Sequence, residues 1–268
     1  ASQRPSGEAA MTLEPAEALL LRSWRASTRI AALPEAVRPA NRAGGYEVAA
    51  RLAELTGDRV AGWKIAATST AGQKHINVDG PLIGRIFARR LLSAGAEVLL
   101  GDNIMKVAEA EFAFAFARDL PPRGEDYSLD EAMQAVAALH LSIEVPDSRY
   151  ADFTRVGAPS LIADTACACW LVLGPALTDG WHNLDLAAHR VSGWRNGEKV
   201  AEGSGAAVLG DPRLALTWFV NEAARHCGGV KAGQFVTTGT CIVPMAIAPG
   251  DRIEIDYGAL GKIGAVIA

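Results

Sequence analysis

Two acidic side chains at alternate positions are the feature of this sequence best suited to chemistry. Glu109 and Glu111 lie in the run Val107–Ala117, whose apolar and small residues predict a β-strand. Because successive side chains of a strand point to opposite faces, both glutamates share a face with Ala113 and Ala115, and the phenylalanines of the run occupy the other face. Two carboxylates roughly 7 Å apart along one strand repel each other unless a positive charge lies between them. The small alanines leave room for a ligand.

A second predicted strand, Leu139–Val145, repeats this arrangement. Its odd-numbered residues are apolar, whereas His140, Ser142 and Glu144 fall on the opposite face. Three carboxylates without a thiol or imidazole motif suit a hard divalent cation such as Mg²⁺ or Mn²⁺. The same spacing also fits a simpler interpretation, in which Glu109, Glu111 and Glu144 belong to solvated strand faces. The sequence pattern alone leaves both interpretations open.

Lys64 is a charged residue within the apolar segment Gly62–Thr68. A lysine at such a position either extends its ammonium group to the surface or works with a carboxylate partner. Asp79 lies in the turn Val78–Pro81, where Asp and Gly are expected for backbone reasons alone. Both residues are therefore candidates that need a further argument.

The elements that must position these side chains can be read from periodicity and from end signals. Helical spacing of apolar residues predicts two helices near the N-terminus, over Glu14–Ser27 and Gly45–Leu55, with a turn at Gly44 and Gly45 before the second. Two more helices carry end signals. A capping box opens one at Ser128, which we expect to run to about Leu139, and an Asp-Pro pair opens the other at Asp211, which closes at Gly228.

Short apolar runs bounded by Gly, Pro and Asp predict strands over most of the remaining chain. A type I′ hairpin is expected at Asn196 and Gly197. The two strands described above are joined by six others, at Trp63–Ala67, Val98–Leu100, Cys167–Leu173, Phe235–Thr238, Arg252–Tyr257 and Ile263–Ile267. This pattern favours a β-rich α+β domain over regular βαβ winding.

Composition narrows the class of protein. The chain has 268 residues, of which 50% are hydrophobic and 21% charged, so it can bury a sizeable core. A formal net charge of −4 argues against a general nucleic-acid binder, which needs a basic surface to neutralise phosphates. No apolar run near the N-terminus is long enough for a membrane span or a signal peptide, and residues 1–10 are interpreted as a polar tail or a remnant left by expression.

Four cysteines in a chain of this length are too few for a disulfide scaffold, which indicates a reducing cytoplasm. A zinc site at Cys167 and Cys169 is an alternative. Burial of these two residues as small hydrophobic side chains fits the alanine-rich segment better.

Several segments, taken in order from about Gly45 to the C-terminus, resemble the 2-keto-4-pentenoate hydratase group of the fumarylacetoacetate hydrolase superfamily, which includes 4-oxalocrotonate decarboxylases. Each motif is modest alone, but their order is specific. They are GWKIAATS (62–69), VDGPLIGRIF (78–87), EAEFAFAFARDL (109–120), IEVPDSR (143–149), ADTACACWLVLG (163–174), GSGAAVLGDP (203–212), TTGT (237–240) and PGDRIEI (249–255).

The resemblance implies a β-rich, mixed-sheet α+β fold, with a helical segment over residues 11–60 and a catalytic domain over residues 61–268. It also implies a set of site residues. Glu109, Glu111 and Glu144 would bind Mg²⁺ or Mn²⁺, Lys64 and Asp79 would handle protons, and Thr238 and Thr240 would line the substrate site. The chain departs from the usual hydratase pattern at Ala49, Val107 and Thr165, none of which belongs to this set.

The expected activity is hydration of a 2-hydroxy-2,4-dienoate to a 4-hydroxy-2-oxo acid in the catabolism of aromatic compounds, by a cytoplasmic homo-oligomer with no nucleic-acid or membrane partner. The main alternative is decarboxylation of a 2-oxo-3-enedioate, which requires a cation for the second carboxylate. Arg85, Arg89 and Arg149 are the candidates for that cation. Hydrolysis of an acylpyruvate and a role as a non-catalytic partner subunit are further alternatives.

Overall fold

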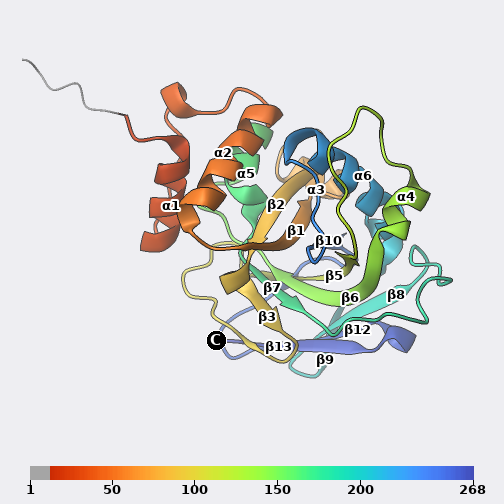
Figure 1. Ribbon diagram of the computed structural model, residues 1–268. Coiled ribbons are helices and arrows are strands. Elements are labelled where there is room, and N and C mark those ends of the chain that lie inside the picture. The colour runs from red at the N-terminus through yellow and green to blue at the C-terminus, as the bar shows by residue number, and fades with distance from the viewer. Residues whose placement is uncertain (1–12) are drawn as a thin grey trace, which may run out of the picture.

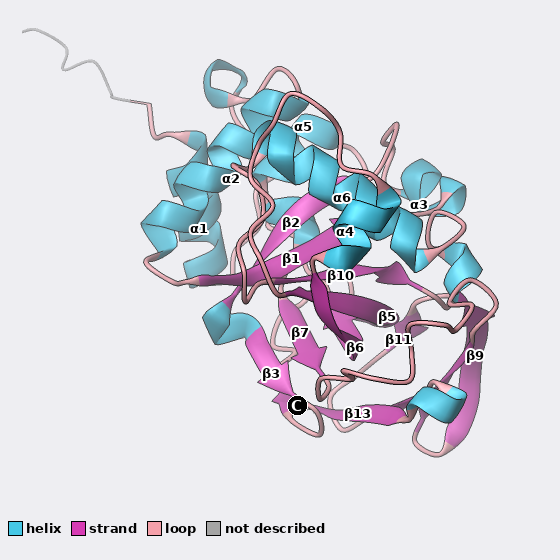
Figure 2. Cartoon of the chain, turned by 45° about the vertical axis from the view of Figure 1, so that its right-hand side comes forward, coloured by secondary structure: helices cyan, strands magenta, loops and turns pink. Residues whose placement is uncertain are grey.

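Two β-sheets carry the fold of the computed structural model, which describes residues 13–268. The predicted tail at residues 1–10 lies outside the described residues. Figures 1 and 2 show the helices gathered on the side of the larger sheet that faces away from the smaller one. The predicted α+β class is therefore confirmed.

The larger sheet has eight strands, and it contains every strand that carries a candidate ligand. Its strand order is β2 (Leu82–Phe87), β1 (Val60–Ala66), β10 (Phe235–Thr240), β5 (Val107–Phe116), β6 (Val136–Val145), β7 (Trp170–Leu173) and β3 (Leu91–Ser93), and β11 (Met245–Ala246) pairs with β5. The pairs β1–β10 and β3–β7 are parallel and the others are antiparallel, which makes the sheet mixed.

The smaller sheet has five strands. Their order is β4 (Glu97–Val98), β13 (Lys262–Ile267), β12 (Arg252–Asp256), β8 (Arg190–Arg195) and β9 (Glu198–Ser204). The predicted hairpin joins β8 to β9 through Asn196 and Gly197, both of which have the positive φ of a type I′ turn.

Six α-helices flank the sheets within the described residues. They are α1 (Ala16–Ala26), α2 (Arg42–Thr56), α3 (Thr70–His75), α4 (Leu129–Gln134), α5 (Ala158–Ala163) and α6 (Pro212–His226). The Asp211 side chain accepts a hydrogen bond from the Arg213 amide at the start of α6, as the Asp-Pro signal predicts. Among residues 13–268, no helix has the length and apolar character needed to cross a membrane.

Several boundaries differ from the sequence prediction. Gly44 and Gly45 do not form a turn but belong to the first turn of α2, which begins earlier because Asn41 caps it. Gly45 is needed there for packing, since a Cβ atom would lie 2.5 Å from the Pro159 carbonyl oxygen of α5.

The helix that opens at the capping box of Ser128 ends at Gln134 rather than near Leu139, because the next residues join β6. Cys167 precedes β7 instead of opening it, and lies in a 3₁₀ turn over residues Thr165–Cys167. Local periodicity did not separate this turn from the strand.

The phenylalanine face of β5 forms the centre of the core. Phe112 and Phe114 are fully buried, and they pack edge-on or tilted against Tyr257 and Trp181. The predicted alternation along β5 is therefore confirmed, and it turns Glu109 and Glu111 away from the aromatic core.

Candidate metal centre and active site

Strand pairing brings the three glutamates together. In the antiparallel register of β5 and β6, Glu109 lies directly opposite Glu144, and Glu111 lies opposite Ser142. One carboxylate oxygen from each glutamate lies within 4.8 Å of the others. Paired residues of an antiparallel ladder share a face, so a cluster suggested by two separate strands becomes one site.

Strand β10 fixes the orientation of Glu111. The Thr237 hydroxyl donates a hydrogen bond to Glu111 Oε2, and the Gly239 amide donates to the same oxygen at 3.1 Å. A β-bulge between Thr237 and Thr240 turns this amide toward the carboxylate. Gly239 has a φ of +112°, and a Cβ atom there would lie 2.2 Å from Thr68 Oγ1, so the bulge requires glycine.

Three carboxylate oxygens of the cluster are buried without a hydrogen-bond partner within residues 13–268, namely Glu111 Oε1, Glu144 Oε1 and Glu144 Oε2. Glu144 Oε1 forms the ion pair with Lys64, which leaves Glu111 Oε1 and Glu144 Oε2 unpaired. A buried carboxylate without a partner is costly, because it loses its hydration without compensation. Oxygen ligands in a confined anionic site are the donor set that Mg²⁺ and related hard cations prefer. The residues present therefore fit a divalent cation.

Lys64 supplies the positive charge that this cluster needs. Its Nζ atom lies 2.9 Å from Glu144 Oε1, and it also donates a hydrogen bond to the Ala166 carbonyl oxygen at 2.9 Å. Burial alone would lower the pKa of Lys64, but the charges of Glu144 and Glu109 outweigh this effect and raise the pKa above its ordinary value. Lys64 is thus a buried, protonated side chain rather than a lysine that extends to the surface.

The surroundings of the three glutamates raise their pKa values and thus favour the neutral form of each carboxyl group. Burial, together with the charge of Glu144, raises the pKa of Glu109 from 4.5 to about 7, and Lys64 only partly offsets this. Burial and the two neighbouring carboxylates raise the pKa of Glu111 well above its ordinary value. Burial also raises the pKa of Glu144, against the opposing charge of Lys64. A bound cation would favour the charged form of all three groups.

The Lys64 acceptor belongs to an unusual turn. Thr165, Ala166 and Cys167 have φ angles of +48°, +52° and +62°, a left-handed conformation that costs energy for residues other than glycine. The buried Asp164 side chain anchors the start of this turn through an ion pair with Arg149. Arg149 Nη2 also donates to the Asp164 carbonyl oxygen at 2.7 Å. These contacts fix the backbone two residues before the Ala166 carbonyl group that accepts from Lys64.

A cavity of about 630 Å³ adjoins the cluster. Lys64 and Glu109 line its inner part, and Val243, whose exposed fraction is 75%, lies on its outer rim. Much of the remaining wall comes from α3, from the loop after β10 and from β9, and single residues of β2, α5 and the loop before β5 complete it. A small molecule that enters this cavity reaches the Glu109 carboxylate and the Lys64 ammonium group, whereas Glu111 and Glu144 lie buried behind them.

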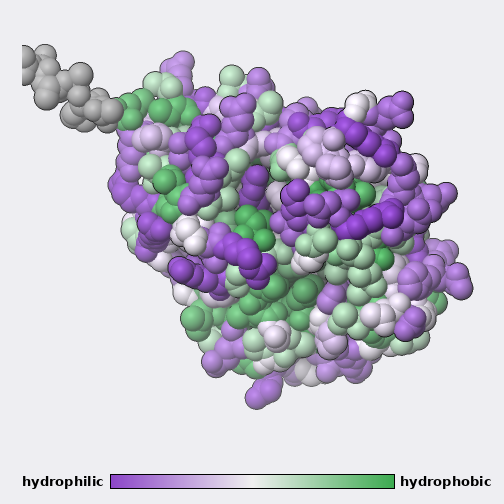
Figure 3. Space-filling view, viewed as in Figure 1, coloured by the Kyte–Doolittle hydropathy of each residue, from purple (hydrophilic) through white to green (hydrophobic). Residues whose placement is uncertain are grey.

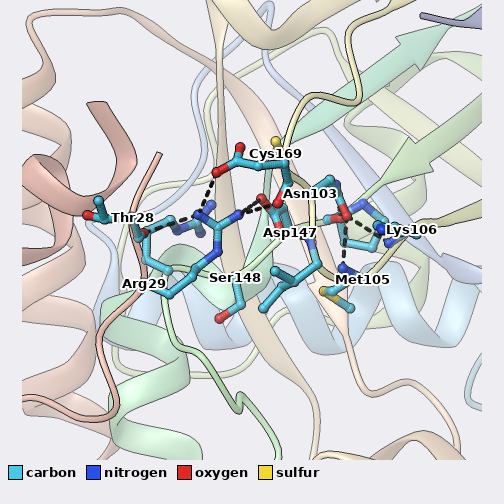
Figure 4. Close-up of polar contacts among 12 residues, drawn as sticks. Thr28, Arg29, Asn103, Met105, Lys106, Asp147, Ser148 and Cys169 are labelled. Atoms are coloured by element: carbon cyan, nitrogen blue, oxygen red, sulfur yellow. Dashed lines mark hydrogen bonds and ion pairs between the residues drawn. The ribbon is translucent and has the colours of Figure 1, made fainter. Parts of the chain in front are cut away.

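A hydrogen-bond network holds the loop that leads into β5. Arg29 Nη2 donates to Asp147 Oδ2 at 2.7 Å, and the Ile104 amide donates to the other oxygen of Asp147 at 3.0 Å. Asn103 Oδ1 accepts hydrogen bonds from the amides of Met105 and Lys106. Figure 4 shows Asp147 between Arg29 and this loop. The network thus places Met105 in the cavity wall, four residues before Glu109.

Not every predicted site residue joins the cluster. Asp79 is exposed, lies 3.6 Å from Arg42 Nη2 and is not among the residues that line the cavity. The Thr238 hydroxyl donates to the Phe112 carbonyl oxygen, so it is occupied by the sheet. Thr240 lines the cavity, as the resemblance implies, and donates to the Ile242 carbonyl oxygen.

The sequence did not identify two residues that hold Glu111 in place. Thr237 holds Glu111, and the Tyr257 hydroxyl donates to the Glu111 carbonyl oxygen at 2.7 Å. Position 237 stood inside the TTGT motif, but no local signal identified its hydroxyl as the contact. Cys167 and Cys169 are buried free thiols. Among the described residues, the glutamate cluster is the one group of His, Cys, Asp or Glu side chains close enough together to hold a metal ion, and neither cysteine belongs to it.

Comparison with known proteins places the chain in a family. The model of the fumarylacetoacetate (FAA) hydrolase C-terminal family matches residues 77–268, which is more than half of the chain. The chain belongs to the fumarylacetoacetate hydrolase family. The resemblance inferred from the ordered motifs is therefore confirmed.

Relatives within the family carry two kinds of name. The chain is 31% identical to 2-keto-4-pentenoate hydratase 1 of Dechloromonas aromatica (strain RCB), over 98% of this chain and 100% of the relative. It is also 31% identical to a 4-oxalocrotonate decarboxylase of Pseudomonas putida, over 80% of each chain. A 2-hydroxyhexa-2,4-dienoate hydratase of Comamonas testosteroni is 32% identical, over 79% of each chain.

A solved structure in the same family agrees with the fold. The 4-oxalocrotonate decarboxylase from Pseudomonas putida G7, complexed with magnesium and adipate, superposes with a TM-score of 0.83 at 27% identity. The match covers 94% of this chain and 97% of the other. The same decarboxylase has also been solved with calcium and acetate.

Proposed function

We propose that this chain is a divalent-metal-dependent hydratase that adds water to a 2-hydroxy-2,4-dienoate and yields a 4-hydroxy-2-oxo acid. The observation that carries the proposal is the cluster of Glu109, Glu111, Glu144 and Lys64, of which Glu109 and Lys64 line one cavity. The names of the hydratase relatives support the same reaction.

Glu109, Glu111 and Glu144 would hold Mg²⁺ or Mn²⁺. When bound, such a cation acts as a Lewis acid that stabilises negative charge on the carboxylate and enol oxygens of a substrate. Magnesium in the related decarboxylase structure supports this choice. The two unpaired oxygens of Glu111 and Glu144 are the atoms of this chain most in need of a cation.

Lys64 is proposed as the group that delivers a proton to the substrate chain. Its Nζ atom carries protons at neutral pH and is fixed by Glu144 and by the Ala166 carbonyl oxygen, which leaves one N–H free for the cavity. Hydration adds hydrogen at C5 and hydroxyl at C4, so one correctly placed acid contributes typically about 10²–10⁴-fold to the rate. Thr240 lines the same cavity and is proposed to contact the substrate.

The positions of three arginines favour hydration over decarboxylation of a diacid. Arg85 stacks on the Trp63 ring at 4.9 Å and is paired across from Trp63, on the opposite face of the sheet from Lys64. Arg89 is exposed after β2, and Arg149 is paired with Asp164. None of these three arginines lines the cavity, so none offers a charge to a second carboxylate there.

The test is a product assay on two substrates. With Mg²⁺ and freshly generated 2-hydroxypenta-2,4-dienoate, we expect 4-hydroxy-2-oxopentanoate with solvent oxygen at C4, detected by mass spectrometry in isotopically labelled water. With 2-oxohex-3-enedioate, we expect little CO₂. Fast CO₂ release without hydration of the dienoate would establish the decarboxylase alternative instead. Failure of both reactions in metal-replete protein would exclude the proposal.

We also propose that the protein works as a homo-oligomer in the cytoplasm. Figure 3 shows hydrophobic side chains gathered in the middle of one face, over β3 and β7. A second apolar cluster of the large sheet is only partly covered, at Ala88, Leu91, Ala115 and Leu173. A symmetric contact between copies of the chain would cover such a surface. A monomer mass by light scattering at micromolar concentration would contradict this expectation.

A further inference from the structure

The wall of the cavity has two chemically different parts. The charged groups nearest the metal cluster are Lys64 and Glu109, whereas the rest of the wall is mainly apolar, with the hydroxyl groups of Thr68, Ser69, Ser204 and Thr240 among it. That apolar wall contains Ile76, Leu82, Met105, Leu161, Ile242 and Val243. A substrate bound by its carboxylate and enol oxygens at the inner end must therefore extend its carbon chain along hydrophobic side chains.

Few charged groups accompany this wall. Lys64 is the one lysine or arginine among the described residues that line the cavity, and its ammonium group is already paired with Glu144. Near the mouth, Glu202 adds a negative charge, although Lys199 Nζ lies 3.0 Å from its carboxylate and Arg190 lies 3.5 Å away. Those two cations are engaged with Glu202 and do not line the cavity. A second substrate carboxylate would find no free counter-charge here.

His75 is the remaining titratable group at the rim contributed by α3. It is exposed, and its ring packs edge-on against Phe153 at 6.1 Å between centroids. His75 therefore adds a polar group to the solvent-accessible part of the cavity lining and not to its buried part.

The size of the cavity points in the same direction. Its volume of about 630 Å³ lies well within the range of roughly 300–1,000 Å³ found for sites that enclose drug-sized ligands. A five-carbon dienoate is much smaller than such a ligand. The spare space lies against apolar side chains, where an alkyl or aryl group gains by leaving water.

We infer that the preferred substrate is a 2-hydroxy-2,4-dienoate whose far end carries an uncharged apolar substituent, and that Ile76 and Val243 select for it. This inference rests on the proposed hydratase function. Ile76 is half-buried at the end of α3, and Val243 lies in the loop after β10, so two separate segments form the selecting surface.

The experiment compares kcat/KM across dienoates that differ only at the far end, namely hydrogen, methyl, propyl, phenyl and carboxylate. For the wild-type protein with saturating Mg²⁺, we expect the propyl compound to exceed the hydrogen compound by about 10-fold, the minimum commonly seen for added methylenes in an apolar pocket. We expect the carboxylate compound to fall at least about 100-fold below the propyl compound, because its charge would be buried without a partner.

Two variants locate the selecting surface. Ile76→Ala should reduce the ratio of propyl to hydrogen turnover by about 10-fold, because it removes the contact that the propyl group gains. Val243→Arg places a cation on the rim and should raise the ratio of carboxylate to propyl turnover by about 10-fold. Val200→Arg is the matched control, since Val200 is also exposed but lies outside the cavity wall, and it should leave both ratios unchanged.

The outcomes distinguish failure of the proposed hydratase function from failure of the inferred substrate specificity. If no dienoate in the series is hydrated, the proposed function itself fails. If the hydrogen compound is hydrated but the propyl compound shows no advantage, or the carboxylate compound reacts equally well, the function stands and the inferred specificity is overturned. An equal response of Val243→Arg and Val200→Arg would show that the loop after β10 does not select the substrate.

Discussion

Replacement of Lys64 by methionine is the sharpest test of the proposed chemistry, because the new side chain keeps much of the volume and removes the charge. The wild-type ammonium group lies 2.9 Å from Glu144 Oε1 and 2.9 Å from the Ala166 carbonyl oxygen. Loss of a general acid lowers kcat by about 10²–10⁴-fold, which corresponds to roughly 3–5 kcal/mol of transition-state stabilisation. We expect KM to change far less than kcat.

The same variant has a predictable effect on stability. In metal-free protein, Lys64→Met leaves Glu144 buried without its counter-charge, and breaking a buried pair in this way costs about 3–5 kcal/mol. Glu144 can reduce this cost by taking up a proton, since its pKa is already raised by burial. Bound Mg²⁺ supplies a new positive charge, so we expect the free energies of unfolding of variant and wild type to lie closer together when Mg²⁺ is present.

The assay combines steady-state kinetics at saturating Mg²⁺ with urea denaturation, with and without the metal. Lys74→Met is the matched control, because Lys74 is exposed on α3 and does not line the cavity, and it should retain wild-type kcat. A Lys64→Met protein with wild-type kcat and a raised KM would refute the proton-delivery role and leave Lys64 as a binding group only.

Three further predictions follow from the same geometry. Glu111→Gln should weaken Mg²⁺ binding at least about 100-fold in calorimetric titration, because a charged ligand is lost. Glu97→Gln, which changes an exposed residue of β4, is the control and should leave the affinity unchanged. Equal affinities of the two variants would show that Glu111 does not bind the metal. The free energy of unfolding of metal-free protein should fall as pH rises from about 4.5 through 7, because the raised carboxyl pKa values make the folded state bind more protons than the unfolded chain. The affinity for Mg²⁺ should rise over the same interval. Urea denaturation in the presence of a chelator that shows the opposite slope would contradict this prediction. Gly84→Ala should lower the free energy of unfolding by about 1–3 kcal/mol and should also lower kcat, because its Cβ atom would lie 2.0 Å from the Thr165 carbonyl oxygen, in the turn that contacts Lys64. Gly124→Ala is the control, since its Cβ atom would meet no atom within 4 Å, and it should change neither quantity.

The sequence was most informative where one local rule determines a whole element. Alternation along Val107–Phe116 correctly separated the aromatic face from the glutamate face, and the end signals of α6 and of the β8–β9 hairpin were confirmed. These features depend on neighbours in the chain, so they are visible without the fold.

Features that depend on distant residues could not be read from their own segments. The role of Thr237 depends on pairing between β10 and β5, and no property of its own segment reveals it. Asp79 matched a motif, and in the structure its exposed side chain lies beside the half-buried Arg42 rather than beside Lys64. Cys167 was predicted to open a strand, but it lies in the turn over Thr165–Cys167, whose left-handed backbone follows the buried ion pair of Asp164 and Arg149 and has no signal in the local periodicity.

The pairing of β1 and β5 with β10 has a consequence for how the protein matures. The hydrogen bond from Thr237 to Glu111 spans 126 residues of chain, and Lys64 lies on a strand whose parallel partner is also β10. During synthesis, β5 and β6 emerge well before β10, so their glutamates must wait for the last part of the chain before Glu111 is oriented. Contacts of such long range form slowly. Acquisition of the metal is therefore expected to be a late event, and a nascent chain that ends before β10 cannot carry a finished site.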